Sequence, residues 1–328
     1  MDATNDSEKK QTNDLLISSS TSLQRLDRQK MKSKPDEEKL LLLGGRIAPN
    51  SVQKFHKGTW QKCADSLKHI DQSAIASNDT HVFVVDGFDR VGHIQMYDIY
   101  KDTWSIAEDT LKIPRSRATA TIIDSKLFLF GGFGMDYLTS TEVFTISGSS
   151  CEPCESHDLP DLKVKRCDHA SVTRNNKVYF IGGTSSRGRL SFCESMNVVT
   201  GESVEFPPLH QARSGMSAVL FNNNVVVMGG CGENRTITDS VETYSFDIKQ
   251  WTMMEAMTTP RYQHCAVIYK DELFVMGGQS DYCDNESCTK SIEVYDPDTK
   301  KWKISRSLFA PVPFASVIKL NRNLTLTE

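Results

Sequence analysis

Residues 258–302 read TTPRYQHCAVIYKDELFVMGGQSDYCDNESCTKSIEVYDPDTKKW and contain, in order, the features that decide the fold. Two runs of β-branched, aromatic and aliphatic residues are separated by the polar turn 270–272 and end at a Gly-Gly pair. Such runs predict a hairpin of two buried strands. A third strand is expected at SIEVYDP (291–297), and a fourth strand opens with Trp302. The stretch therefore predicts a four-stranded antiparallel unit.

The same unit recurs along the chain. An apolar run ends in Gly-Gly five times and in Asp86-Gly87 once, and the second residues of these pairs are about 42 to 51 positions apart. The glycine pairs are Gly44-Gly45, Gly131-Gly132, Gly182-Gly183, Gly229-Gly230 and Gly277-Gly278, and an arginine stands 16 residues before the first glycine of four pairs at Arg115, Arg166, Arg213 and Arg261. A period of this length is close to that of the four-stranded blade of a propeller. Six copies predict six blades.

The recurring residues resemble those of kelch repeats: arginine before the first strand, Gly-Gly after the second, Glu-x-Tyr on the third and tryptophan on the fourth. The resemblance covers roughly Lys39 to Leu320, and residues 258–302 are especially similar to repeats of kelch-like proteins. The third and fourth copies lack the tryptophan, and Ile70 and Pro311 stand where arginines are expected. The resemblance implies a β-propeller that acts by recognition.

The two ends of the repeat region predict how the ring closes. Residues 39–43 form a second strand with no first strand before it, and residues 314–320 form a first strand with no second strand after it. Pairing these segments completes one blade and removes two open sheet edges. We therefore predict an all-β, six-bladed kelch propeller over residues 39–328, closed by a C-terminal strand that completes the first blade. Residues 321–328 then form a short tail.

Composition limits the partners and the compartment. The chain has 38 Lys+Arg and 42 Asp+Glu residues, interspersed, so it has no broad positive field for nucleic acid or an anionic membrane. No stretch approaches the roughly 18 apolar residues that span a bilayer, and the N-terminus lacks the apolar core of a signal peptide. We expect a cytoplasmic or nuclear protein with reduced cysteines. Residues 1–38 are polar and without aromatic residues, so we expect a disordered tail, with 22–32 as a candidate for a short helix.

Metal and catalytic motifs are weak in this sequence. Cys151, Cys154 and His157 have the spacing of zinc ligands, with Cys167 and His169 nearby, but no second closely spaced pair follows. We interpret this segment as a decorated loop and expect neither a metal nor another cofactor. A nucleophile elbow, a phosphate loop and a catalytic carboxylate pair are not recognisable, so an enzyme of the propeller oxidase or isomerase kind is the least favoured alternative.

Residues that repeat serve the framework, whereas residues that differ between blades carry the information about function. The glutamates Glu142, Glu194, Glu242 and Glu293 recur on the third strand and are interpreted as structural. The four repeat arginines leave two alternatives open, a structural ion pair or contact with a partner. The loops after the glycine pairs are rich in residue types that are enriched at interfaces. We predict a partner-binding rim of Phe88, Arg90, Phe133, Met135, Tyr137, Arg187, Arg189, Arg235 and Tyr282, and we include Arg115, Arg166, Arg213 and Arg261 as candidates.

The predicted function is therefore recognition of a protein or peptide without catalysis. Resemblance to kelch-like proteins implies the substrate-recognition end of a cullin-RING ubiquitin ligase. That family normally places BTB and BACK regions before the propeller, where this chain has a polar tail. An actin-associated scaffold, also known among kelch proteins, is the structural alternative. A cullin-RING component and actin are thus the two candidate partners.

Overall fold

The computed structural model describes residues 38–107, 110–148, 150–154, 159–281, 287–308 and 310–320. The chain divides into two units, Met1–Glu38 and Lys39–Glu328, and all elements below belong to the second. The predicted tail 1–37, the candidate helix 22–32 and the predicted tail 321–328 lie outside the described residues.

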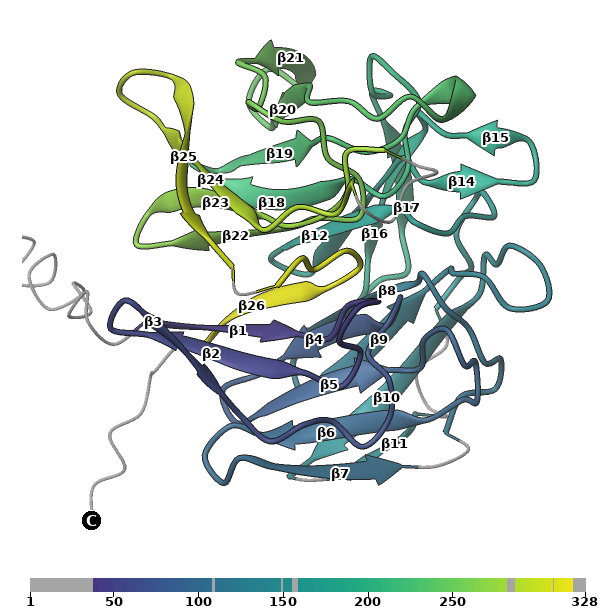
Figure 1. The fold of residues 1–328 in the computed structure, drawn as a ribbon. Coiled ribbons are helices and arrows are strands. Elements are labelled where there is room, and N and C mark those ends of the chain that lie inside the picture. Colours follow the sequence, from purple (N-terminus) through teal and green to yellow (C-terminus); the bar gives the residue numbers. More distant parts are fainter. Residues whose placement is uncertain are drawn as a thin grey trace, which may run out of the picture. The chain divides into compact units, whose positions relative to one another are not determined.

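Six four-stranded antiparallel sheets form the six blades (Figure 1). Blades 1 and 2 consist of β26 (Ser316–Leu320), β1 (Lys39–Leu43), β2 (Val52–His56) and β3 (Thr59–Lys62), and of β4 (Ala74–Ser77), β5 (His81–Val85), β6 (Ile94–Asp98) and β7 (Thr103–Ala107). Blades 3 and 4 consist of β8 (Thr119–Ile123), β9 (Lys126–Phe130), β10 (Thr141–Ser147) and β11 (Ser150–Pro153), and of β12 (Ala170–Arg174), β13 (Lys177–Ile181), β16 (Cys193–Asn197) and β17 (Ser203–Phe206). Blades 5 and 6 consist of β18 (Ser217–Phe221), β19 (Asn224–Met228), β20 (Val241–Ser245) and β21 (Gln250–Met254), and of β22 (Cys265–Tyr269), β23 (Glu272–Met276), β24 (Ser291–Asp296) and β25 (Lys301–Ser307).

The first strands of the blades form the inner wall of the propeller. Contacts run from β26 to β4, β8, β12, β18 and β22 in turn, and from β22 back to β26, so the ring is closed. Two short strands, β14 (Thr184–Ser185) and β15 (Gly188–Arg189), make a separate hairpin in blade 4, and the 3-10 helix η1 (Glu233–Arg235) lies in blade 5. Within the described ranges, no helix is long and apolar enough to cross a membrane.

Closure by the C-terminal strand is confirmed. In Figure 1 the yellow β26 lies beside the purple β1, and their register runs from Lys39 opposite Leu320 to Leu43 opposite Ser316. The strand begins at Ser316, two residues after the predicted start. Leu41 and Leu43 of β1 are fully buried, because blades pack face to face around the ring.

The glycine pairs are required where strands of adjacent blades approach closely. Gly131 and Gly132 have φ angles of 59° and 103°, in the left-handed region that favours glycine. A Cβ at Gly131 would lie 2.9 Å from Arg166 O of the next blade, and one at Gly132 would lie 2.8 Å from Ser116 O. A larger residue at Gly131 would therefore force blades 3 and 4 apart, and one at Gly132 would clash with the segment that enters blade 3.

Tryptophans on the fourth strands tie neighbouring blades together. The indole nitrogen of Trp104 donates to Ala64 O at 3.0 Å, that of Trp251 to Pro207 O at 2.7 Å, and that of Trp302 to Glu255 O at 2.9 Å. Each acceptor belongs to the segment that leaves the preceding blade. These bonds fasten the outer strand of one blade to the segment that leaves the blade before it.

Candidate functional site

One end of the propeller carries all the loops from which the predicted site residues come. We call it the loop face: it holds the connections from the second to the third strand of each blade and those from the fourth strand to the next blade. Strands alternate in direction, so these two kinds of connection emerge together. The turns between the first and second strands, and those between the third and fourth strands, lie at the opposite end.

The four repeat arginines are buried in the framework rather than displayed on the loop face. Their side chains are at most 1% exposed, and each forms an ion pair with the repeat glutamate of its own blade. The pairs are Arg115–Glu142, Arg166–Glu194, Arg213–Glu242 and Arg261–Glu293. Of the two alternatives from the sequence, this geometry supports the structural ion pair. The structure contradicts the alternative in which Arg115, Arg166, Arg213 and Arg261 contact a partner, because their guanidinium groups are buried.

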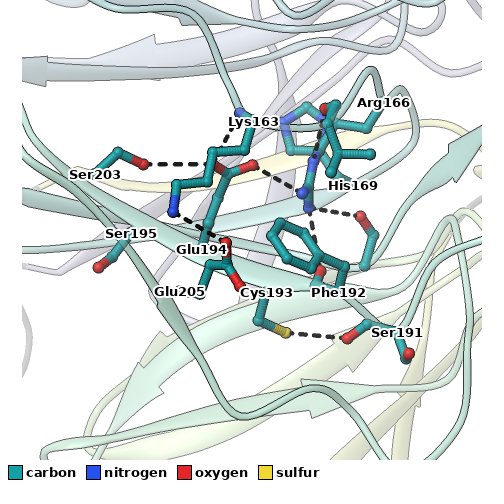
Figure 2. A network of polar contacts seen from close by, with 12 residues as sticks. Lys163, Arg166, His169, Ser191, Phe192, Cys193, Glu194, Ser195, Ser203 and Glu205 are labelled. Atoms are coloured by element: carbon teal, nitrogen blue, oxygen red, sulfur yellow. Dashed lines mark hydrogen bonds and ion pairs between the residues drawn. The ribbon is translucent and has the colours of Figure 1, made fainter.

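Figure 2 shows the network in blade 4. Arg166 Nη2 lies 2.9 Å from Glu194 Oε1, and its Nη1 donates to Gly182 O at 3.0 Å and Phe192 O at 3.2 Å. The other carboxylate oxygen, Glu194 Oε2, accepts from the backbone N–H of Lys163 at 3.0 Å. The arginine thus holds the ends of the second and third strands, and the glutamate holds the loop that enters the blade.

Where the arginine is absent, the glutamate is absent too. Blades 1 and 2 have Gln53 and Gln95 at the glutamate position. Gln95 keeps the loop contact through its amide oxygen, which accepts from Lys68 N–H at 2.7 Å. A lone buried glutamate would carry an uncompensated charge, so glutamine accompanies the loss of arginine.

The residue that replaces arginine in blade 1 is Val312 and not Pro311. Arg46 N–H donates to Pro313 O at 3.0 Å, as Phe133 N–H donates to Ser116 O at 2.8 Å in blade 3. Pro313 is therefore equivalent to Ser116, and the residue before it takes the arginine position. Val312 lies four residues before β26, as Arg115 lies four residues before β8.

A polar ring surrounds the mouth of the central channel on the loop face. One residue from each blade has a positive φ there, and five successive pairs are joined by backbone hydrogen bonds of 2.8 to 3.0 Å. The six residues are Gln72, Arg117, Asp168, Gly215, Gln263 and Phe314. The cavity behind them has a volume of about 290 Å³. They escaped the sequence-based prediction, although each stands two residues after the repeat arginine or its replacement.

Side chains of the ring form a network across four blades. Arg117 Nε donates to Gln72 Oε1 at 2.7 Å, and Gln263 Nε2 donates to Asp168 Oδ1 at 2.8 Å. Arg117 Nη1 lies 3.4 Å from Asp168 Oδ2. Burial raises the pKa of Asp168 above the ordinary range of aspartate, while Arg117 and Gln263 act in the opposite direction. These contacts satisfy the ring internally.

The predicted rim residues of blades 2 and 3 come together on the loop face. The rings of Phe133 and Tyr137 meet edge to face at 5.2 Å, and the Arg90 guanidinium lies 5.8 Å from the centre of the Phe133 ring. Arg90 Nη1 also donates to Gly134 O. Met135 is fully exposed at the tip of the loop, whereas Phe133 and Tyr137 are half-buried.

Further apolar side chains extend this cluster. Phe88 is 61% exposed, Val91 49% and Ile113 38%. A Cβ at Gly134 would lie 3.5 Å from Ile113 Cγ2, so the loop of Met135 adjoins the segment that enters blade 3. We call Phe88, Arg90, Val91, Ile113 and Met135 the blade 2–3 patch. Val91 and Ile113 were not predicted, because their exposure depends on how two loops from different blades meet.

The predicted arginines of blades 4 and 5 lie apart from this patch. Arg187 is exposed at the tip of the β14–β15 hairpin, and Arg189 is half-buried with Nη2 3.4 Å from Cys231 Sγ. Arg235 is exposed in η1. Tyr282 lies outside the described residues.

The candidate zinc ligands do not come together in the described part of the chain. Cys151 is buried on β11, and His169 shares a 2.9 Å hydrogen bond between its Nε2 and Thr119 Oγ1. His157 lies outside the described residues, and among the rest no group of three His, Cys, Asp or Glu side chains could hold a metal ion. The buried cysteines Cys63, Cys151, Cys167, Cys193, Cys231 and Cys265 are free thiols.

Comparisons with known proteins agree with this architecture. The family model for the Kelch motif matches residues 114–156, 212–258 and 260–308. The chain is 22% identical to human Kelch-like protein 23 and 24% identical to Kelch-like protein terF of Aspergillus terreus, over 72% and 74% of its own length. It spans only 40% and 59% of those two proteins. It is also 26% identical to alpha-scruin of Limulus polyphemus, over 68% of this chain and 26% of scruin.

The fold is shared with a solved structure. The structure of YjhT superposes with a TM-score of 0.68 at 12% identity, covering 81% of this chain and 94% of YjhT. Likeness at this identity concerns the fold alone.

Proposed function

Because the chain is a kelch-repeat β-propeller, we propose that it binds another protein, or a peptide segment of one, through the blade 2–3 patch of its loop face. The observation that carries this proposal is the exposure of Phe88 and Met135 beside an ordered arginine. Exposed apolar side chains that adjoin one another mark interaction sites on soluble proteins.

The patch is suited to binding energetically. Burying a side chain such as Phe88 or Met135 contributes about 1.5 to 3 kcal/mol each. Arg90 is already held by Gly134 O and by the Phe133 ring, so a partner need not pay the full entropy of ordering it. Aromatic, methionine and arginine side chains are the types enriched at such interfaces.

Binding rather than catalysis is proposed because the recurring charged residues serve the framework. The repeat arginines and glutamates satisfy one another inside the blades, and His169 and His264 are buried between blades. Free cysteines fit a reducing compartment, so we place the protein in the cytoplasm or nucleus.

The similarity to kelch-like proteins supports a finer proposal, in which the bound protein is the substrate of a cullin-RING ubiquitin ligase. In that case Arg187, Arg189 and Arg235 extend the contact from the patch toward blades 4 and 5. An actin-associated scaffold is the alternative. Capture of interacting proteins from lysate separates the two, since a cullin complex or actin would be recovered.

The test of the patch uses paired variants and a purified partner identified by that capture. Met135→Asp and Phe88→Ser should each weaken binding by at least about fivefold while leaving the melting temperature unchanged, because both side chains are exposed. Tyr100→Ser is the matched control: Tyr100 is 59% exposed in the turn between β6 and β7, at the opposite end. Binding that falls with Tyr100→Ser and not with the patch variants would place the site on the opposite end.

A further inference from the structure

The seam between blades 6 and 1 lacks the tryptophan bond that fastens other seams. At those seams, the acceptor carbonyls of Ala64 and Glu255 lie four residues after the tryptophan of the preceding blade. By the same spacing, Trp60 of blade 1 would donate to the carbonyl of Arg306 in blade 6. The indole nitrogen of Trp60 donates to no described residue.

A β-bulge at the end of β25 accounts for this difference. Glu293 of β24 pairs with Ile304, but Ser291 pairs with Ser307, so β25 has one residue more than its partner between these points. A bulge bends the strand and re-aims its side chains, and bulges occur often beside functional sites. Arg306 here bridges the seam with its side chain, through Nη1 to Gly58 O at 3.0 Å.

The seam encloses a cavity of about 470 Å³ with aromatic walls, a volume typical of small-molecule sites. The Phe55 ring lies 5.1 Å from the Trp60 ring and 5.9 Å from the Tyr269 ring, and the Tyr269 and Phe274 rings are 5.8 Å apart. The flanking turns, 57–58 and 270–271, lie at the end opposite to the loop face. The cavity is therefore distinct from the blade 2–3 patch.

The polar groups around the cavity are donors and cations. Arg306 and Lys270 are the charged residues that line it, and the Lys270 ammonium lies 5.6 Å from the centre of the Tyr269 ring. The remaining polar groups of the side chains are the Trp60 indole N–H and the hydroxyls of Thr59, Tyr269, Ser305 and Ser307, all of which can donate. None of the described lining residues is acidic. A ligand that complements this set has a flat apolar body and a negative charge.

We propose that the seam cavity binds a small aromatic anion, such as an aromatic carboxylate or sulfonate. The aromatic walls take the ring system, which stacks on or meets their faces. Arg306 and Lys270 take the anionic group, and Trp60 Nε1 donates a hydrogen bond to it. The bulge of β25 leaves the Trp60 indole free for this role.

The test uses two dyes that share a ring system and differ in charge. 8-Anilinonaphthalene-1-sulfonate is anionic, and N-phenyl-1-naphthylamine is its uncharged counterpart. With the full chain, fluorescence titration should give one saturable site for the anionic dye. The double variant Lys270→Gln/Arg306→Gln should weaken it at least tenfold and the neutral dye less than threefold, and Trp60→Phe should weaken the anionic dye several-fold.

Two controls separate the cavity from general stickiness. Trp104→Phe changes the equivalent tryptophan at a closed seam, and Met135→Ser changes the exposed patch, and neither should alter dye affinity. Cooperative melting curves show that the variants fold, and Trp104→Phe should melt somewhat lower because it loses the bond to Ala64 O. Absence of a saturable site, equal loss of both dyes, or anionic-dye binding unaffected by the seam variants would each overturn the proposal.

Discussion

Replacing Arg213 with alanine tests whether the repeat arginines belong to the framework. Arg213 Nη2 lies 2.6 Å from Glu242 Oε1, and Nη1 donates to Gly229 O at 3.1 Å and Ser240 O at 3.2 Å. Truncation leaves the fully buried Glu242 carboxylate without its counter-ion and two carbonyls without their donor. His210, whose Nδ1 lies 2.7 Å from Glu242 Oε2, is half exposed and compensates weakly.

The expected cost follows from these lost contacts. Removing one partner of a buried ion pair destabilises a protein by about 3 to 5 kcal/mol, because the remaining charge is desolvated and unpaired. For a domain of this size, each kcal/mol lowers the melting temperature by roughly 2 °C, so Arg213→Ala should melt about 6 to 10 °C below the wild type. Arg213→Lys should lose less, since lysine keeps the charge but lacks the planar fork that reaches three acceptors.

Differential scanning calorimetry of the purified chain measures the effect. Arg187→Ala is the matched control, because Arg187 is exposed on the hairpin of the adjacent blade and its loss should change stability by less than about 0.5 kcal/mol. An Arg213→Ala protein that melts with the wild type and binds its partner more weakly would refute the framework assignment and restore the arginine to the binding surface.

Three further predictions concern the blades and their joints. Trp251→Ala should destabilise the fold by about 3 to 5 kcal/mol in urea unfolding, since it empties a 7% exposed aromatic and breaks the bond to Pro207 O. Deleting residues 311–328 removes β26 and exposes the edge of β1, so the chain should lose its cooperative melt or its free energy of unfolding should fall by several kcal/mol. A melting temperature within a few degrees of that of the full chain would contradict the closure. Burial lowers the pKa of His264 to about 3, so the unfolded chain binds its proton first as pH falls below about 6.5. His264 alone should therefore cost about 1.6 kcal/mol of stability between pH 6.5 and 5, and His264→Gln should reduce the pH dependence by that amount in unfolding curves taken at both pH values. The buried His169, whose pKa is also lowered by burial, accounts for dependence that remains.

The strands were predictable from the sequence because their pattern repeats. The strand 39–43 is where the apolar run places it, the predicted turn 270–272 is one residue shorter because Glu272 begins β23, and ring closure follows from two incomplete ends. The role of the arginines was not decidable in this way, because a residue before an inner strand can point into the blade or out of it. Only the contact in space between each arginine and its glutamate, which stands 27 to 32 positions later in the chain, shows that the arginine side chain points into the blade.

The site was predictable only in part. The loops after the glycine pairs do lie on one face, and Met135 and Phe88 are exposed there. Phe133 and Tyr137 instead cover one another, and Val91 and Ile113 contribute surface that the sequence did not mark. Loop exposure depends on contacts between blades, and those contacts have no periodic signature.

Arginine occurs together with glutamate in four blades, and Ile70 and Val312 occur together with glutamine in the other two. This pairing limits how such repeats can change over time. A blade that exchanges only one of the two residues passes through an intermediate in which a buried carboxylate or a buried guanidinium has no counter-ion. That intermediate is several kcal/mol less stable than either paired state. The two positions therefore behave as a single heritable character with two permitted states. In engineering this propeller, a blade grafted from one group to the other should carry both positions together, and libraries that vary them independently will consist mostly of proteins that do not fold.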